Sequence, residues 1–177
     1  EGVLKKKYYL FKKEDGSETY TQWSDAGDYG GQSASITTDS TGQYRWDVPE
    51  GTWKVEVSRE GYQTSSVSGL EVPPPQTDVN IAMKSTSSPT VKKVQAYSDG
   101  VLVEFSQYMD IDSVRKAISL TVNGEPVTCT VSPLDAETDT NKESSRTYAS
   151  RFQVTPTGGG ALTGCVALTV STDAKSY

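Results

Sequence analysis

Residues able to perform covalent chemistry are few in this chain of 177 residues. The chain contains no histidine, which removes Ser-His-Asp and Cys-His nucleophile systems and any imidazole ligand for zinc. Three consecutive glycines, 158–160, lack the Lys-Ser/Thr that follows in a phosphate-binding loop, and we interpret them as a turn. Two positioned carboxylates could hydrolyse a glycoside, but the acidic residues here mostly occupy turns and the polar sides of expected strands. We therefore predict that the chain is not an enzyme.

Aspartates supply the hard oxygen ligands that Ca²⁺ prefers. The candidates are Asp25, Asp28 and Asp39 in the first half of the chain, and Asp110 and Asp112 in the second. None belongs to a dense Asp-x-Asp-x-Asp-Gly loop, and roles in helix capping and turns are favoured. We predict no metal site and no cofactor.

Tyr20, Trp23 and Tyr29 are the candidate ligand-binding residues. They lie in polar sequence between two expected strands, where no periodicity requires their burial. Exposed aromatic rings can stack on sugar faces or anchor a protein partner. The alternative, which is favoured, is that this segment folds over the domain and buries the rings. The sequence leaves both possibilities open.

The two cysteines, Cys129 and Cys165, could form one disulfide or remain as two thiols. In an alternating strand Cys129 shares the face of Val127 and Val131, whereas Cys165 belongs to a different pattern. The two side chains are therefore expected to face differently. Packing as small apolar residues is favoured over a disulfide, and both alternatives stay open.

Short β-strands joined by turns are the elements expected to position these residues. The chain has 15 glycines, 8 prolines and 10 tyrosines, and no extended stretch of helix formers. In Tyr44–Val48 and in Thr52–Val57 apolar residues alternate with polar ones, and Pro49-Glu50-Gly51 between them is typical of a chain reversal. We predict an antiparallel hairpin over residues 44–57.

Other strands are expected along both halves of the chain, together with one helical turn that begins at Asp110 or Asp112 and runs through Val114 and Ile118. Turns are predicted at Ser98-Asp99-Gly100 and Asn123-Gly124, and a mobile polar loop over residues 135–146. The remaining expected strands are 3–11, 36–38, 61–67, 70–72, 79–83, 91–97, 101–105, 118–122, 127–131, 148–154 and 165–170.

Residues 85–89 (STSSP) contain nothing apolar to bury and are predicted to be a linker. They separate a first domain, residues 1–84, from a second, residues 90–177. The expected fold class is all-β, with two tandem antiparallel β-sandwiches.

Part of the first domain resembles the carboxypeptidase regulatory-like family. The resemblance rests on Thr37–Tyr44 (TTDSTGQY), Val48–Val55 (VPEGTWKV) and Gly61-Tyr62, which follow the family's order of turn, aromatic strand, Pro-x-Gly turn, second aromatic strand and Gly-Tyr corner. It implies a transthyretin-like sandwich of seven strands, found as a non-catalytic accessory in many secreted proteins. Residues 12–32 depart from the pattern as an insertion rich in Gly, Asp and aromatics.

The start of the second domain looks like bacterial immunoglobulin-like domains. Val101–Ser106 (VLVEFS) is followed by Met109-Asp110, as in a family where a strand ending in Phe-Ser precedes Met-Asp and one helical turn. The later segments 122–124 and 162–170 agree less specifically. Neither family has a catalytic motif to carry over.

Charge and hydropathy limit the partners. A net charge of -6 and a pI near 4.7 disfavour nucleic acid, and no apolar run is long enough to cross a membrane. We expect part of a longer extracellular or cell-surface bacterial protein, whose partners are the neighbouring domains of the same polypeptide. The predicted function is a non-catalytic structural spacer. The alternative is an adhesin module that binds a glycan or a host or cell-wall protein through residues 20–29.

Overall fold

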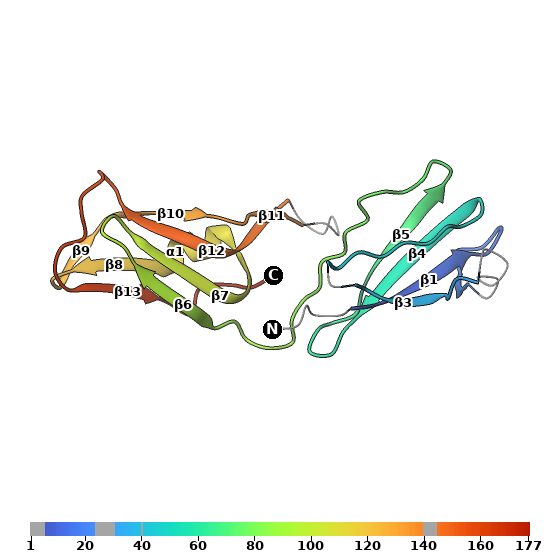
Figure 1. Ribbon diagram of the computed structural model, residues 1–177, viewed down its shortest axis with the longest axis horizontal. Helices are drawn as coiled ribbons and strands as arrows, with labels where there is room; N and C mark the ends of the chain where they lie inside the picture. The colour runs from blue at the N-terminus through green and yellow to red at the C-terminus, as the bar shows by residue number, and fades with distance from the viewer. Residues whose placement is uncertain (1–5, 24–30, 40, 140–144) are drawn as a thin grey trace. The chain divides into compact units, whose positions relative to one another are not determined.

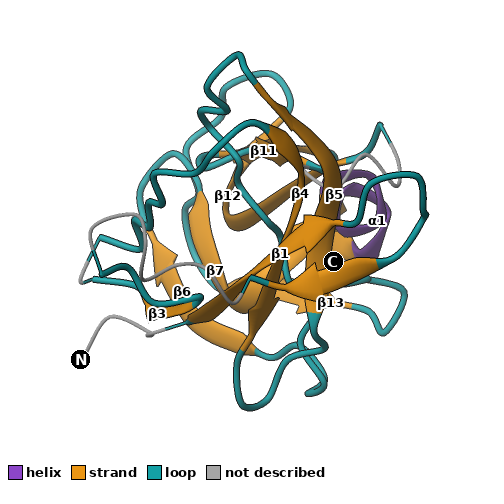
Figure 2. Ribbon diagram, turned by 90° about the vertical axis from the view of Figure 1, so that its right-hand side faces the viewer, coloured by secondary structure: helices purple, strands orange, loops and turns teal. Residues whose placement is uncertain are grey.

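The computed structural model describes residues 6–23, 31–39, 41–139 and 145–177. The chain divides into two compact units, residues 1–86 and 87–177, which are coloured blue to green and green to red in Figure 1. We name them unit 1 and unit 2 and describe each by itself. Antiparallel strands dominate the described residues (Figure 2), which confirms the predicted all-β sandwich class. No helix among these residues is both long and apolar enough to span a bilayer.

Unit 1 is built on one antiparallel sheet with the strand order β2-β1-β4-β5, and β3 also pairs with β1. Alternation along β1 buries Tyr8 and Leu10, each 3 % exposed, and directs Tyr9 and Phe11 to the other face. The strands are β1 (Lys7–Lys13), β2 (Tyr20–Gln22), β3 (Ser35–Thr37), β4 (Gly51–Ser58) and β5 (Ser65–Val72).

The core of unit 1 lies on the face of the sheet that carries Tyr8, Trp53 and Val57. Side chains from two segments outside the sheet, 41–49 and 76–84, pack against it. Their contribution to the core comes from Tyr44, Trp46, Val48, Ile81 and Met83.

The hairpin predicted for residues 44–57 is wrong. Tyr44, Trp46 and Val48 alternate inward as expected, but this segment is not a strand of the ladder, and β4 pairs with β1 and β5 instead. Residues 79–83, also expected as a strand, do not belong to a sheet either. Alternation of apolar and polar residues shows that one side of each segment is buried, but it does not specify which strand the segment pairs with.

β5 is one continuous strand, where the sequence predicted two. The register between β4 and β5 shifts between Trp53 and Val55, and the extra residues on β5 include Gly69 at φ +71°. A glycine in this conformation is a feature of a β-bulge, which allows the strand to continue on the far side. Gly69, which lies between the two expected strands, therefore marks a bulge within one strand.

Unit 2 has two antiparallel sheets that enclose its core. One has the order β10-β12-β7-β6, with β11 paired to β12, and the other has the order β13-β8-β9. The elements are β6 (Val91–Ala96), β7 (Val101–Asp110), α1 (Ile111–Ala117), β8 (Ile118–Val122), β9 (Glu125–Val127), β10 (Cys129–Pro133), β11 (Glu137–Thr138), β12 (Thr147–Pro156) and β13 (Val166–Val170).

The helical turn predicted in unit 2 is present as α1. Asp110 is its N-cap and accepts a hydrogen bond of 2.8 Å from the backbone N–H of Ser113. Val114 is fully buried, but Ile118 is the first residue of β8 and not part of the helix. Here the helix ends one residue earlier than the apolar spacing suggested.

Both predicted turns of unit 2 join paired strands. The backbone N–H of Tyr97 donates to the carbonyl of Gly100 at 2.8 Å, which closes the β6–β7 hairpin. Asn123 and Gly124 both have positive φ, +54° and +86°, as a two-residue type I′ turn between β8 and β9 requires. The prediction of a loop over residues 135–146 is wrong in part, because residues 137–138 form β11. Residues 140–144 of this predicted loop lie outside the described residues.

Candidate functional site

Trp23, the central residue of the predicted binding loop, belongs to the core of unit 1. Its side chain is 4 % exposed and meets the ring of Trp53 edge to face, with centroids 5.1 Å apart. Its backbone N–H donates to the carbonyl of Leu10 at 3.1 Å, which continues the pairing of β2 with β1. Of the two alternatives left open by the sequence, the structure shows burial for this ring, so Trp23 offers no stacking surface.

Tyr20 has a structural partner at the bulge of β5. Its hydroxyl accepts a hydrogen bond of 3.1 Å from the backbone N–H of Gly69, and its ring is half-buried. The hydroxyl thereby satisfies a backbone donor that the bulge removes from the ladder. Tyr29 lies outside the described residues. Of the three predicted site residues, the structure thus gives Tyr20 and Trp23 structural partners and does not describe Tyr29.

The outward face of β1 carries two aromatic rings that the sequence analysis did not single out. Tyr9 and Phe11 are half-buried, and lysine ammonium groups lie over both of them. Lys7 is 5.1 Å from the centroid of Tyr9, and Lys54 is 5.0 Å from that of Phe11. The run of apolar residues at 8–11 occupies both faces of a strand, which is the signal that could have indicated an aromatic outer face.

These contacts between lysines and aromatic rings stabilise the outer face of the sheet, and they cover the rings that a ligand would have to contact. An ammonium group over an aromatic ring contributes roughly 0.5–1 kcal/mol when it is exposed. Lys54 also forms an ion pair of 3.2 Å with Glu56, its neighbour on the same face of β4. A sugar that stacked on Phe11 would first have to displace this lysine.

Aspartates considered as calcium ligands have roles in turns and caps where the structure describes them. Asp39 accepts hydrogen bonds from the N–H and hydroxyl of Thr41 and from the N–H of Gln43, and these bonds lower the pKa of its carboxyl group. Asp110 caps α1, and Asp112 forms an ion pair with Arg115 at 3.1 Å. Asp25 and Asp28 lie outside the described residues. Among the residues described, no cluster of three acidic or sulfur ligands could hold a metal ion.

Cys129 and Cys165 are both free thiols. Cys129 is half-buried against the core of unit 2, and burial raises the pKa of its thiol. Cys165 is exposed next to β13, and its N–H donates to the side chain of Asn123 at 2.9 Å. The favoured alternative of two unpaired cysteines is the one that the structure shows.

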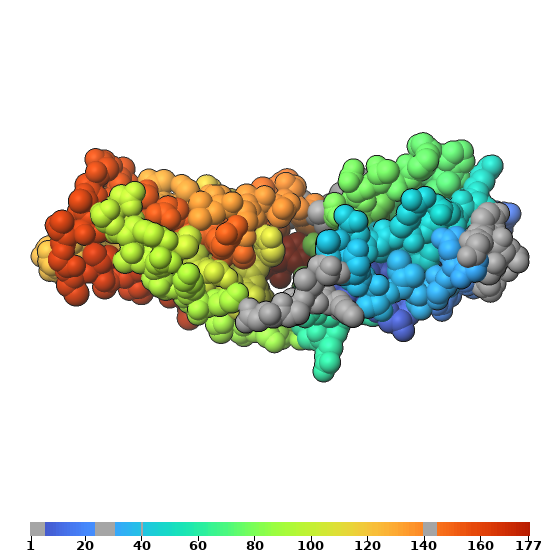
Figure 3. All heavy atoms as spheres, in the orientation of Figure 1, coloured from blue at the N-terminus to red at the C-terminus, as the bar shows by residue number. Residues whose placement is uncertain are grey.

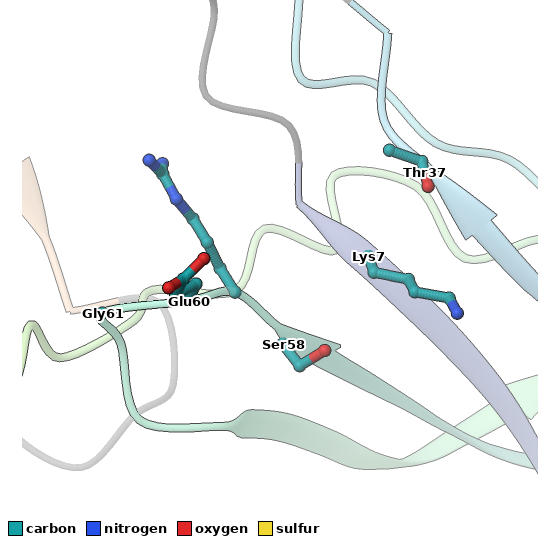
Figure 4. Close-up of a pocket in the computed structure, with 6 residues that line it drawn as sticks. Lys7, Thr37, Ser58, Glu60 and Gly61 are labelled. Atoms are coloured by element: carbon teal, nitrogen blue, oxygen red, sulfur yellow. The ribbon is translucent and has the colours of Figure 1, made fainter.

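A hollow at one end of the unit 1 sheet is lined by polar residues of β1, β3 and the turn after β4. Glu60 is the one carboxylate among its lining residues, and Figure 4 shows Lys7 extending to one side while Glu60 lies on the other. Glycoside hydrolysis requires two carboxyl groups facing one another across a bond. This hollow lacks that arrangement.

A second hollow lies at the start of α1 in unit 2. Three carboxylates line it, those of Asp110, Asp112 and Asp173, and so do the side chains of Ser113, Lys116 and Arg146. Asp110 already accepts the helix N–H and lies 3.5 Å from Arg146. Asp173 accepts from the hydroxyl of Ser171 at 3.0 Å. These carboxylates are engaged in fixing the chain around the helix.

Residues 19–84 match the family model of the carboxypeptidase regulatory-like domain. This family consists of non-catalytic β-sandwich modules. The match covers most of unit 1, including β2 and the segment after it, and none of unit 2. Comparisons with curated proteins and with solved structures find no match.

Proposed function

We propose that the chain is a non-catalytic structural spacer of a larger secreted or cell-surface bacterial protein. Its partners in this proposal are the neighbouring domains of the same polypeptide. The match of unit 1 to a non-catalytic accessory family supports this role. The observation that carries the proposal is a set of hydrogen bonds at Thr86 and Ser87, in the segment that connects the two units.

The connecting segment is hydrogen-bonded at Thr86, the last residue of unit 1, and at Ser87, the first residue of unit 2. The N–H and the hydroxyl of Thr86 both donate to the carbonyl of Gly61 in unit 1, each at 2.9 Å. The next carbonyl, that of Ser87, accepts from the side chain of Gln107 in unit 2 at 2.7 Å. A short linker that is bonded at both of its ends suits a spacer better than a long flexible one would.

We further propose that unit 2 is a bacterial immunoglobulin-like domain. Support comes from β7, which contains Phe105-Ser106 and ends with Met109-Asp110, immediately before the short helix α1. Asp110 caps that helix, which explains why this position would require an aspartate. The two-sheet arrangement of unit 2 has the layering of that fold.

Distance measurements between spin labels test the spacer. Labels are placed at exposed Ser68 in unit 1 and Thr169 in unit 2, in a chain whose two native cysteines are replaced by serine. We expect a narrow distance distribution that broadens when Gly-Ser-Gly-Ser is inserted between Thr86 and Ser87. The same insertion after Gly159, in an exposed turn, is the control and should leave the distribution narrow. A wild-type distribution as broad as that of the linker insertion would reject the spacer.

A binding role for residues 20–29 loses its main support because the ring of Trp23 is in the core. The intact chain on a glycan array separates the two functions. The spacer predicts no selective signal. Reproducible binding of one glycan class would establish a binding module instead.

A further inference from the structure

β6 is an edge strand that leaves large apolar side chains exposed. It forms one end of its sheet and pairs with β7 alone among the described residues. All six of its residues are exposed, Val91 to 43 % and Val94 to 52 %. Figure 1 shows β6 along the margin of unit 2, and the same stretch of the chain lies at the surface in Figure 3.

The free side of β6 offers backbone groups in the pattern of a sheet ladder. Tyr97 and Gly100 form the hydrogen-bonded pair that closes the hairpin. Residues that exchange hydrogen bonds alternate along an antiparallel pair, so Gln95 bonds to Leu102, whereas Val94 and Ala96 direct their N–H and C=O groups away from β7. Two donors and two acceptors are thus presented at the spacing that another strand would use.

The two faces of this edge differ in chemistry. Val94 lies opposite the fully buried Val103, so it extends the apolar inner face of the sheet beyond the covered core. Lys93 lies opposite Glu104 on the outer face. Lys92 also reaches that glutamate, at 2.8 Å. An added strand would therefore meet apolar side chains on one face and two ammonium groups on the other.

We propose that β6 is the docking site for an extended segment of a partner protein in which apolar residues alternate with acidic ones. Such a segment would continue the sheet beyond β6, cover Val91 and Val94 with its apolar side chains, and place its carboxylates beside Lys92 and Lys93. A second copy of β6 would bring the same two lysines to the new edge, so charge complementarity favours a different, acidic partner.

The probe for this proposal is a capped ten-residue peptide that alternates valine and glutamate, and its control alternates valine and lysine. The readout is amide hydrogen exchange of the whole chain. We expect saturating Val-Glu peptide to slow exchange at Val94 and Ala96 by about tenfold or more, because their N–H groups become bonded. Gln95, already bonded within the sheet, should change little. Raising the ionic strength should weaken the protection, since the lysines are exposed.

Two variants link the readout to the edge. Ala96→Pro removes an N–H that faces solvent and leaves the β6–β7 hydrogen bonds in place, so the chain should fold while the protection at Val94 is lost. Lys93→Glu should abolish protection by the Val-Glu peptide. Lys116→Glu, at an exposed position on α1, is the charge-matched control and should retain it.

Three results would overturn the proposal. Equal protection by both peptides would show that charge does not select the partner. Protection that rises with protein concentration, without peptide, would show that β6 binds a second copy. No protection under any condition would mean that the lysines only keep this edge from pairing, as they do on many exposed strands.

Discussion

Asp135 is bound to β12 at the point where the register of that strand with β7 shifts, between Ala149 and Arg151. Its carboxylate accepts from the N–H and hydroxyl of Ser150 and from the N–H of Arg151. Burial raises the pKa of this carboxyl group, but the hydrogen bonds outweigh it, and the net pKa is lowered. One side chain thus satisfies backbone groups that the irregular ladder leaves unpaired.

Replacing Asp135→Asn should lower the free energy of unfolding of unit 2 by about 1–3 kcal/mol at neutral pH, because charged acceptors are lost. A carboxyl group whose pKa is lowered by folding stabilises the fold at pH values above its ordinary pKa of 3.8. This contribution is lost as the pH falls through the pKa of the folded state. Urea unfolding at neutral and acidic pH should therefore show the variant approaching the wild type in acid. A difference that is the same at both pH values would contradict the assignment.

Tyr44 joins segment 41–49 to segment 76–84 in unit 1. Its hydroxyl donates to the carbonyl of Val79, and its ring stacks on Tyr8 with centroids 4.0 Å apart. Burial, followed by the proximity of Tyr8, strongly raises the pKa of the Tyr44 hydroxyl. The ring therefore stays neutral when it is folded.

Because the pKa of Tyr44 is raised, the free energy of unfolding of unit 1 should depend on pH in the alkaline range. The unfolded tyrosine loses its proton near its ordinary value of 10.0, whereas the folded one keeps it, so stability is fully present below that pH and falls as the pH rises above it. Tyr44→Phe should reduce this slope in urea unfolding of unit 1 between about pH 8 and pH 11. An unchanged slope would show that the hydroxyl is not protected.

At the scale of elements, the sequence predicted most strands but not always their partners. Hydrophobic alternation found β4, β6, β7, β8 and β12, and turn chemistry placed the two hairpins of unit 2. The segment 44–48 shows the same alternation and packs on the core, yet it pairs with nothing in the ladder. Pairing depends on which backbone edges meet in space, and this information is not contained in the period of one segment.

The candidate site was less predictable than the strands. Trp23 follows a three-residue strand, too short for a period to emerge, and its burial depends on Trp53, thirty positions along the chain. The bulge at Gly69 divides one strand into the two short segments that the sequence predicted, because glycine is favoured in bulges and in turns alike. The exposed side of β6 was also not foreseen, because alternation does not distinguish an edge strand from a central one.

Gly100 closes the β6–β7 hairpin in a position without room for a side chain. A Cβ atom there would lie 2.7 Å from the carbonyl oxygen of Val154. Gly100→Ala should therefore destabilise unit 2 by about 1–3 kcal/mol through overpacking. Gly160→Ala, at an open position without positive φ, should be nearly neutral. Thermal unfolding of both variants measures this, and equal midpoints would contradict the predicted contact.

At the scale of the whole molecule, two cores imply two units of stability. Trp53 and Phe152 are among the largest fully buried side chains, one in each unit. Truncating either to alanine should cost its own unit about 3–5 kcal/mol. Because each of the two core clusters consists of residues of a single unit, amide exchange should rise only in the unit that carries the change. Faster exchange in the core of the other unit would show that the two fold as one.

The edge-to-face contact of Trp23 with Trp53 also has an optical consequence. Trp46 is the third tryptophan of the chain, and all three belong to unit 1. Indole emission therefore reports the unfolding of unit 1 alone. The unfolding of unit 1 can therefore be followed in an unmodified sample without a label.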